Sequence, residues 1–267
     1  MTGTRNMEEK IFIPGKIKAH TGGRRYSTDT LGKSGASVYI YDDMVLKAEK
    51  YSPEFDTQIK LYEWLGGKLP VPELIEWDIA DGMSYMLTSR ISGHNGCDKD
   101  MLDHPETLTE LLAEGLKMLW DTDITGCPRE NTYDVNLSQM KKRIDSDPAS
   151  LEGICRENGF SDAYELLGYL DSHRPGYDPV FSHGDFCLPN IFFDNNTVSG
   201  FIDIGNAGIS DRYSDISDCL RSLRRNTDGT FGRVISGFDP DMLFEKLGIS
   251  PDREKIRFFD IIESVFF

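Results

Sequence analysis

Two short apolar runs in the C-terminal half constrain the fold of this 267-residue chain more than any other feature. Ile191–Phe193 and Val198–Ile202 have the length and composition of strands, and the turn-forming residues Asp194-Asn195-Asn196 join them. We therefore expect a β-hairpin. It would carry Asn190 just before its first strand and Asp203 just after its second, so that both side chains lie at the same end.

The residues around this hairpin match the needs of phosphoryl transfer. That reaction needs a carboxylate that orients a hydroxyl and accepts its proton, and oxygen ligands that hold magnesium against nucleotide phosphates. Asp185, in His183-Gly184-Asp185, suits the first role, and Asn190 with Asp203 suits the second. A His-Gly-Asp tripeptide alone would carry little weight. The prediction depends on its combination with the hairpin.

Charge limits the classes of ligand. The formal net charge of -16 argues against nucleic acid, whose phosphates need a basic surface. An acidic cleft would instead attract a cationic small molecule, although many acidic proteins carry such charge for solubility alone.

The cysteines and the apolar runs indicate the cellular setting. The five cysteines are scattered and include no CxxC pair, a pattern typical of reduced thiols in the cytoplasm. No apolar run approaches membrane-spanning length, and the polar N-terminus does not resemble a signal peptide. We therefore expect a cytoplasmic protein without a membrane partner. The sequence does not indicate an oligomeric state.

Periodicity predicts an α+β fold of two lobes, a β-rich lobe over residues 1–92 and a mainly helical lobe over 93–267. Apolar and β-branched residues predict strands in the first lobe, and 3.6-residue periodicity predicts the helices. The expected strands are Arg25–Thr30, Val38–Tyr41, Met44–Lys47, Leu74–Ile79 and Ser84–Thr88. The expected helices are Pro53–Leu65, Pro105–Trp120, Val135–Ile144, Asp162–Ser172, Tyr213–Arg224, Asp239–Leu247 and Asp252–Val265.

The first lobe holds candidates for nucleotide binding. Lys47, in the short strand Val45–Ala48, stands where a kinase carries the lysine that pairs with phosphates. The glycine-bearing loop 32–37 is suited to close over phosphates through its backbone N–H groups. Its Gly32-Lys33-Ser34 is not a Walker A motif, because Ser27 replaces the upstream glycine and a strand follows.

A wider set of motifs points to one family. They are Trp64-Leu65 before Leu69-Pro70-Val71-Pro72, Asp123-Ile124 before Cys127-Pro128, Phe181-Ser182-His183-Gly184-Asp185, Val198-Ser199-Gly200-Phe201-Ile202-Asp203, Asp211-Arg212-Tyr213 with Asp215-Ile216, and a C-terminal helix ending in aromatics. Across most of its length the chain resembles the aminoglycoside phosphotransferases, of the group that modifies the 3′-hydroxyl of kanamycin- and neomycin-type antibiotics.

The resemblance implies a two-lobed fold similar to that of protein kinases, with ATP and magnesium as cofactors. It implies Asp185 as catalytic base and Asn190 and Asp203 as magnesium ligands. It also implies a nucleotide site of four residues: Lys47 on the phosphates, Ser34 in the phosphate loop, and Ser89 and Ile91 offering backbone groups to the base.

On the substrate side the resemblance implies an acidic pocket for a cationic aminoglycoside or a similar small molecule. Candidate contacts are Glu152, Glu157, Glu263 and the terminal residue Phe267. The chain departs from the family's usual pattern at several pocket positions, among them Cys155, Asn206, Arg225 and Asn226, where relatives carry other residues.

Two departures concern the nucleotide. Gln58 replaces the glutamate that usually pairs with the lysine, and Val45 replaces an aromatic that stacks on adenine, which leaves GTP open as the nucleotide.

Two other functions remain open. The altered pocket suits a kinase of the same fold acting on another small hydroxylated molecule. Gln58 suits a nucleotide-binding module that has lost catalysis, although the retained Asp185 and Lys47 argue against it. A protein kinase fits poorly, because the chain passes from Asp203 almost directly into a helix without a long activation segment.

Overall fold

The computed structural model describes residues 12–29 and 36–266 of the chain. Contacts divide it into two compact units, one formed by Met1–Phe55 with Glu73–Arg90 and the other by Asp56–Pro72 with Ile91–Phe267. Ser34 and Phe267, both expected at the site, lie outside the described residues.

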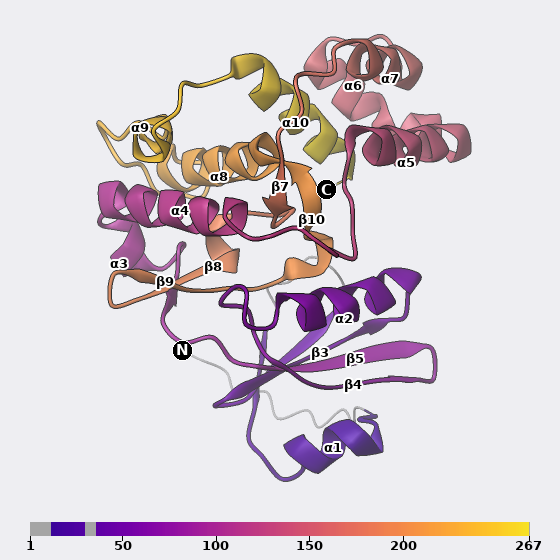
Figure 1. Ribbon diagram of the computed structural model, residues 1–267, viewed down its shortest axis with the longest axis vertical. Helices are drawn as coiled ribbons and strands as arrows, with labels where there is room; N and C mark the ends of the chain where they lie inside the picture. The colour runs from indigo at the N-terminus through magenta and orange to yellow at the C-terminus, as the bar shows by residue number, and fades with distance from the viewer. Residues whose placement is uncertain (1–11, 30–35, 267) are drawn as a thin grey trace. The chain divides into compact units, whose positions relative to one another are not determined.

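The first unit is built on an antiparallel sheet with strand order β1-β2-β3-β5-β4 (Figure 1). Its strands are β1 (Ser27–Asp29), β2 (Ser37–Ile40), β3 (Met44–Lys50), β4 (Leu74–Ala80) and β5 (Met83–Ser89). All five overlap the predicted strands. Asp81 and Gly82 join β4 to β5 with φ angles of 53° and 75°, as a tight hairpin turn requires.

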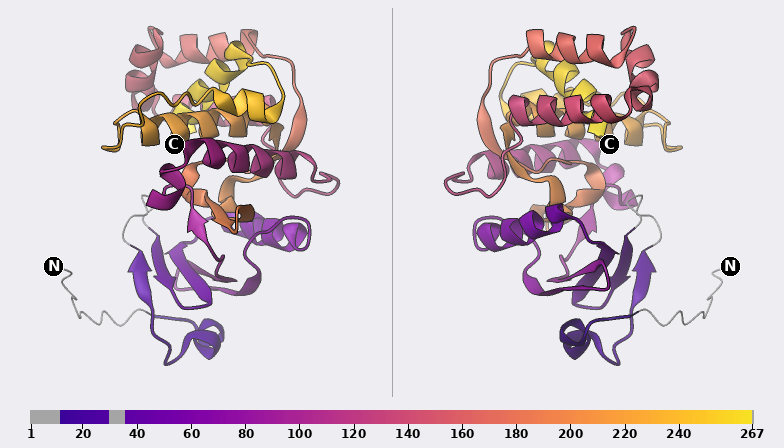
Figure 2. Two further views of the ribbon diagram at one scale, coloured as in Figure 1. Left: turned by 90° about the vertical axis from the view of Figure 1, so that its left-hand side faces the viewer. Right: turned by 90° about the vertical axis from the view of Figure 1, so that its right-hand side faces the viewer.

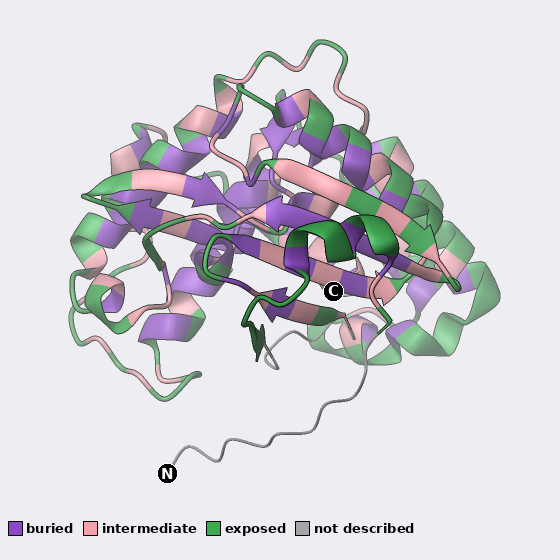
Figure 3. Cartoon of the chain, turned by 90° about the horizontal axis from the view of Figure 1, so that it is seen from below, coloured by how far each residue is buried: buried purple, intermediate pink, exposed green. Residues whose placement is uncertain are grey.

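Helix α1 (Gly15–Thr21), which sequence reasoning missed, packs near β4 on this sheet. Its Ile17 is fully buried among Tyr39, Leu46, Leu87 and other core side chains. Figure 3 shows the outer face of α1 exposed in front of strands whose residues range from buried to exposed. Only Ile17 and Thr21 of its seven residues are buried, so the segment has too few apolar residues to show helical periodicity.

The second unit is mainly helical. Its helices are α3 (Lys99–Leu102), α4 (Pro105–Trp120), α5 (Tyr133–Ser146), α6 (Glu152–Asn158), α7 (Ala163–Ser172), α8 (Arg212–Thr227), α9 (Met242–Leu247) and α10 (Arg253–Phe266). Every helix predicted in this part of the chain is present, and α4 has the predicted bounds. No helix in the described part of the chain is both long and apolar enough to cross a membrane.

Two small antiparallel sheets complete this unit. One has the order β6-β8-β9, and the other pairs β7 with β10. Their strands are β6 (His94–Asn95), β7 (Pro179–Ser182), β8 (Ile191–Asp194), β9 (Thr197–Phe201) and β10 (Gly208–Asp211). The predicted hairpin β8–β9 is confirmed, and both Asn195 and Asn196 in its turn have positive φ. Strand β10 was missed because it has a single large apolar residue, Ile209.

Helix α4 forms the centre of this unit. It contacts β8 and β9 as well as α8 and α9, and the side views in Figure 2 show it between these strands and helices. At Gly115 an added Cβ would lie 3.2 Å from the ring of Phe186 and 3.4 Å from that of Phe201. The absence of a side chain there allows both aromatic rings to pack closely on the helix.

Helix α2 (Pro53–Leu65) has the predicted bounds, but residues 56–72 group with the second unit and not with the β-rich part of the chain. The contacts of Trp64 explain this grouping. Its ring packs at 5.3 Å from that of Phe181, and its Nε1 donates to the carbonyl of Thr125 at 3.2 Å. The expected division at residue 92 assigned this helix to the N-terminal lobe.

A buried ion pair fixes the start of α8. Asp211 is fully buried, and its carboxylate accepts from the backbone N–H of Asp178 at 2.8 Å and of Tyr213 at 3.0 Å. Lys255 of α10 donates to the same carboxylate at 2.7 Å. Asp211 thus caps α8 and joins it to α10.

Lys255→Met should lower the free energy of unfolding of the second unit by about 3–5 kcal/mol, because it leaves the Asp211 carboxylate buried without its cation. Urea unfolding followed by circular dichroism would measure the loss. Lys99→Met, which removes an exposed i,i+4 partner of Asp103, is the matched control and should leave the midpoint unchanged. Equal effects of the two substitutions would contradict the role of the pair.

Candidate active site

A buried carboxylate organises the loop between β7 and β8. Asp215 of α8 is fully buried and accepts three hydrogen bonds, from Ser182 Oγ at 2.9 Å, His183 N at 2.9 Å and Gly184 N at 3.0 Å. Burial raises the pKa of Asp215, and these donors act in the opposite direction. The three donors fix the backbone that leads directly into Asp185.

Two further contacts shape the loop. Gly184 has φ of +74°, and a Cβ there would lie 2.4 Å from the carbonyl oxygen of Asn206, so only glycine fits. His183 is buried, and its Nε2 makes a hydrogen bond of 3.0 Å with the carbonyl of Ile202 at the end of the hairpin. The loop and the hairpin are thereby held together.

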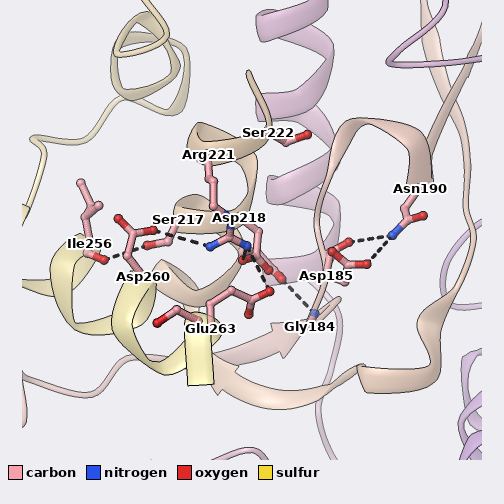
Figure 4. A network of polar contacts seen from close by, with 12 residues as sticks. Gly184, Asp185, Asn190, Ser217, Asp218, Arg221, Ser222, Ile256, Asp260 and Glu263 are labelled. Atoms are coloured by element: carbon pink, nitrogen blue, oxygen red, sulfur yellow. Dashed lines mark hydrogen bonds and ion pairs between the residues drawn. The ribbon is translucent and has the colours of Figure 1, made fainter. Parts of the chain in front are cut away.

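Asn190 holds the carboxylate of Asp185. Its Nδ2 donates both to the backbone carbonyl of Asp185 at 3.0 Å and to Oδ2 at 2.9 Å (Figure 4). The Cys187 side chain also hydrogen-bonds to Asp185, and burial together with this carboxylate raises the pKa of the thiol. Cys187 therefore remains a neutral thiol beside the Asp185 carboxylate.

The hairpin brings Asn190 and Asp203 to the same end. Ile191 pairs with Phe201, and the N–H of Ile202 donates to the carbonyl of Asn190 at 2.9 Å. Asp203 has φ of 56°, in the left-handed region that residues other than glycine, asparagine and aspartate rarely adopt. Burial and the nearby Asp203 charge both raise the pKa of Tyr62.

Both residues have the oxygen atoms that a magnesium ion prefers. The Nδ2 of Asn190 is engaged by Asp185, so the amide oxygen is turned away from these bonds and is left for a cation. The carboxylate of Asp203 is likewise a hard oxygen donor of the kind that magnesium prefers. Asn190 and Asp203 therefore fit the ion for which the sequence predicts them.

The described nucleotide-side candidates lie on β3 and around the end of β5. Lys47 is on β3, paired with Met86 of β5, and its Nζ lies 3.6 Å from Glu49 Oε2. Ser89 ends β5 and its Oγ accepts from Glu73 N at 2.9 Å, whereas Ile91 begins the longer of the two segments that form the second unit. Their roles stay predictions.

The structure places an acidic residue that sequence reasoning missed beside Asp185. One carboxylate oxygen from each of Asp185, Asp218 and Glu263 lies within 4.8 Å of the others (Figure 4). Arg221 pairs with Asp218 at 2.7 Å and with Glu263 at 3.0 Å. Spacing on α8 was the available signal, because Asp215 and Asp218, three residues apart, share one face of this helix.

The other substrate-side candidates lie elsewhere. Glu152 and Glu157 are exposed on α6, a helix that contacts the helix α10 on which Glu263 lies. Neither belongs to the cluster of Asp185, Asp218 and Glu263. Of the predicted substrate contacts among the described residues, only Glu263 lies close to Asp185.

Sequence comparison relates the chain to known phosphotransferases. Residues 32–244 match the model of the phosphotransferase enzyme family. The chain is 34% identical to an aminoglycoside 3′-phosphotransferase of Enterococcus faecalis, over 96% of this chain and 99% of that protein. It is 33% identical to an aminoglycoside 3′-phosphotransferase of Staphylococcus aureus over the same shares of the two chains.

Structural comparison agrees. The chain superimposes on the crystal structure of an aminoglycoside-3′-phosphotransferase of type VIII with a TM-score of 0.77 and 22% identity, covering 94% of this chain and 97% of that one. A phosphotransferase of Streptomyces rimosus, solved with ADP and streptomycin, gives a TM-score of 0.71 at 20% identity and covers 94% of this chain and 96% of that one. These similarities confirm the predicted two-lobed α+β fold.

Glu263 should make stability depend on pH. Burial, opposed by Arg221, raises the pKa of Glu263 from 4.5 to about 7. The native state therefore binds more protons than the unfolded state between these values, and the free energy of unfolding should fall by roughly 3 kcal/mol as pH rises through this interval. Thermal unfolding measured from pH 4.5 to 7.5 should show that the stability of Glu263→Gln depends less on pH than that of the wild type.

Glu152→Gln, which alters an exposed carboxylate on α6, is the control for this pH effect and should keep the wild-type profile. A wild-type profile that stays level or rises over the same interval would contradict the raised pKa of Glu263.

Proposed function

The chain belongs to the phosphotransferase enzyme family, and we propose that it transfers the γ-phosphate of ATP to the 3′-hydroxyl of an aminoglycoside antibiotic and so confers resistance. Relatives named for this activity match it over nearly their whole length at 33–34% identity. The observation that carries the proposal is the Asp185 carboxylate, held by Asn190 next to a hairpin end that presents Asp203.

Asp185 would act as the base. Its carboxylate accepts a hydrogen bond from the acceptor hydroxyl and takes the proton as the hydroxyl oxygen bonds to the γ-phosphorus and the bond to the ADP oxygen breaks. Asn190 would act as a positioning residue through its bond to Oδ2, which leaves Oδ1 for the hydroxyl. The donors to Asp215 would keep the loop in place during this step.

Asn190 and Asp203 would hold magnesium, which, when bound, offsets charge on the nucleotide phosphates. The orientation of the Asn190 amide supports this assignment, since its nitrogen is committed to Asp185.

Four residues would serve the nucleotide. Lys47 would pair with its phosphates and Ser34 would lie in the phosphate loop. Ser89 and Ile91 would offer backbone groups to the base. Val45 on β3 can pack on a purine ring but cannot stack as an aromatic does, so GTP remains an alternative to ATP.

Asp185→Asn should reduce turnover by at least about a thousandfold with little change in nucleotide affinity, because it removes the proton acceptor and keeps the side-chain size. Coupled ADP release with kanamycin would measure turnover, and calorimetry with a non-hydrolysable ATP analogue would measure affinity. Asp194→Asn, at the exposed end of β8, is the matched control and should be neutral. Near-normal turnover of Asp185→Asn would refute its role.

The acceptor can be identified directly. Bacteria that express the chain should resist kanamycin or neomycin, and mass spectrometry with NMR of the product should place the new phosphate on the 3′-oxygen. Expression of Asp185→Asn at the same level should abolish the resistance. If no aminoglycoside is modified while another small alcohol is, the alternative kinase of the same fold is correct. Nucleotide binding without transfer to any acceptor would favour an inactive module.

A further inference from the structure

Asp218 has an unusual environment for an aspartate. Its side chain is only 2% exposed, and Arg221 engages Oδ1 at 2.7 Å. The other oxygen, Oδ2, is buried and receives no hydrogen bond from any described residue of the chain. A buried carboxylate oxygen without a donor costs free energy, so its retention needs a reason.

Several carboxyl groups surround Asp218. Asp185 and Glu263 each place a carboxylate oxygen within 4.8 Å of one on Asp218. Arg221 is shared by Asp218, by Glu263 at 3.0 Å and by Asp260 at 3.7 Å, so one guanidinium faces three carboxylates. Burial raises the pKa of Asp218 and of Glu263, as expected where negative charge is incompletely balanced.

We propose that Asp185, Asp218 and Glu263 form a subsite for an ammonium group of the acceptor, with Asp218 as a residue that determines specificity. An ammonium has three N–H donors, one for each carboxylate. Oxygens at hydrogen-bond distance around one tetrahedral nitrogen lie about 4.6 Å apart, which fits the spread of the cluster. The proposal rests on the aminoglycoside phosphotransferase function.

The charges favour a monovalent organic cation over a metal ion. Arg221 already brings a fixed positive charge against two of the three carboxylates, and it would repel a divalent ion more strongly than an ammonium. A divalent ion bound to Asp185 would also weaken this carboxylate as a base, whereas an ammonium leaves the cluster net negative.

The shared use of Asp185 defines where the ammonium lies on the acceptor. The same carboxylate would accept the proton of the reacting hydroxyl and a hydrogen bond from the ammonium, so both groups must lie close to it. An amine on the carbon next to the one that bears the acceptor hydroxyl meets this requirement. The preferred acceptor is therefore a vicinal amino alcohol.

Kanamycin A and kanamycin B test this directly, because they differ only at the carbon next to the 3′-hydroxyl, which carries a hydroxyl in A and an amine in B. Wild-type kcat/KM should favour B by about tenfold or more, as expected for a buried charge pair. Asp218→Asn should lower kcat/KM for B by about tenfold to a hundredfold and for A by no more than about threefold, so that the preference disappears.

Asp260→Asn is the matched control. Asp260 contacts the same Arg221 but is not part of the cluster, so this substitution should leave the B-to-A ratio at its wild-type value. If Asp218→Asn does not fold, Glu263→Gln gives the same readout from a less buried position and should also reduce the preference for B.

An unchanged B-to-A ratio in the cluster variants, or an equal loss for both acceptors, would overturn the subsite and leave the proposed function intact. Preference for B only in the presence of added calcium or manganese would show a metal site instead. If the wild type phosphorylates neomycin but neither kanamycin, the subsite fails and the proposed function stands. If it phosphorylates no aminoglycoside, the proposed function fails and the subsite fails with it.

Discussion

The site of this protein depends on the Asp215 carboxylate buried under a loop. A carboxylate that is fully buried costs free energy unless donors surround it, and here three consecutive residues, Ser182 to Gly184, supply those donors. The cost and the geometry are linked, because the same hydrogen bonds that make the burial of Asp215 tolerable fix the backbone next to Asp185. The backbone that leads into Asp185 is thus positioned by a buried side chain from another element, α8.

Helix α8 positions the residues around Asp185 through several side chains along its length. Asp215 holds the loop before Asp185, Ser222 accepts from the N–H of Leu188 after it at 3.0 Å, and Asp218 lies beside the Asp185 carboxylate. Asp211 caps the helix and connects it through Lys255 to α10, which carries Glu263. Helix α8 therefore positions both the loop that carries Asp185 and the acidic residues near this loop.

The sequence predicted local features best. The hairpin β8–β9 followed from alternating apolar runs and two asparagines that accept positive φ, and α4 from a continuous leucine stripe. It failed where tertiary contacts decide: α1 has only Ile17 and Thr21 buried, and β10 is stabilised by pairing with β7. The contacts of Trp64 that group residues 56–72 with the second unit are likewise not visible in the sequence. Asp218 was missed for the same reason. It becomes a candidate site residue only because it lies close to Glu263, which is 45 positions later in the chain.

The residues in and around the cluster of Asp185, Asp218 and Glu263 have two different proposed roles, one in the transfer of the phosphate and one in recognition of the acceptor. In the proposed reaction, Asp185 and Asn190 would serve the transfer step with any acceptor hydroxyl, whereas Asp218 and Glu263 would add negative charge that this step does not require. Arg221 offsets this charge only in part, and a closer balance would remove the attraction for a cation. If the proposed subsite is correct, incomplete neutralisation beside Asp185 costs stability in the empty site and contributes affinity only when the acceptor brings its own positive charge.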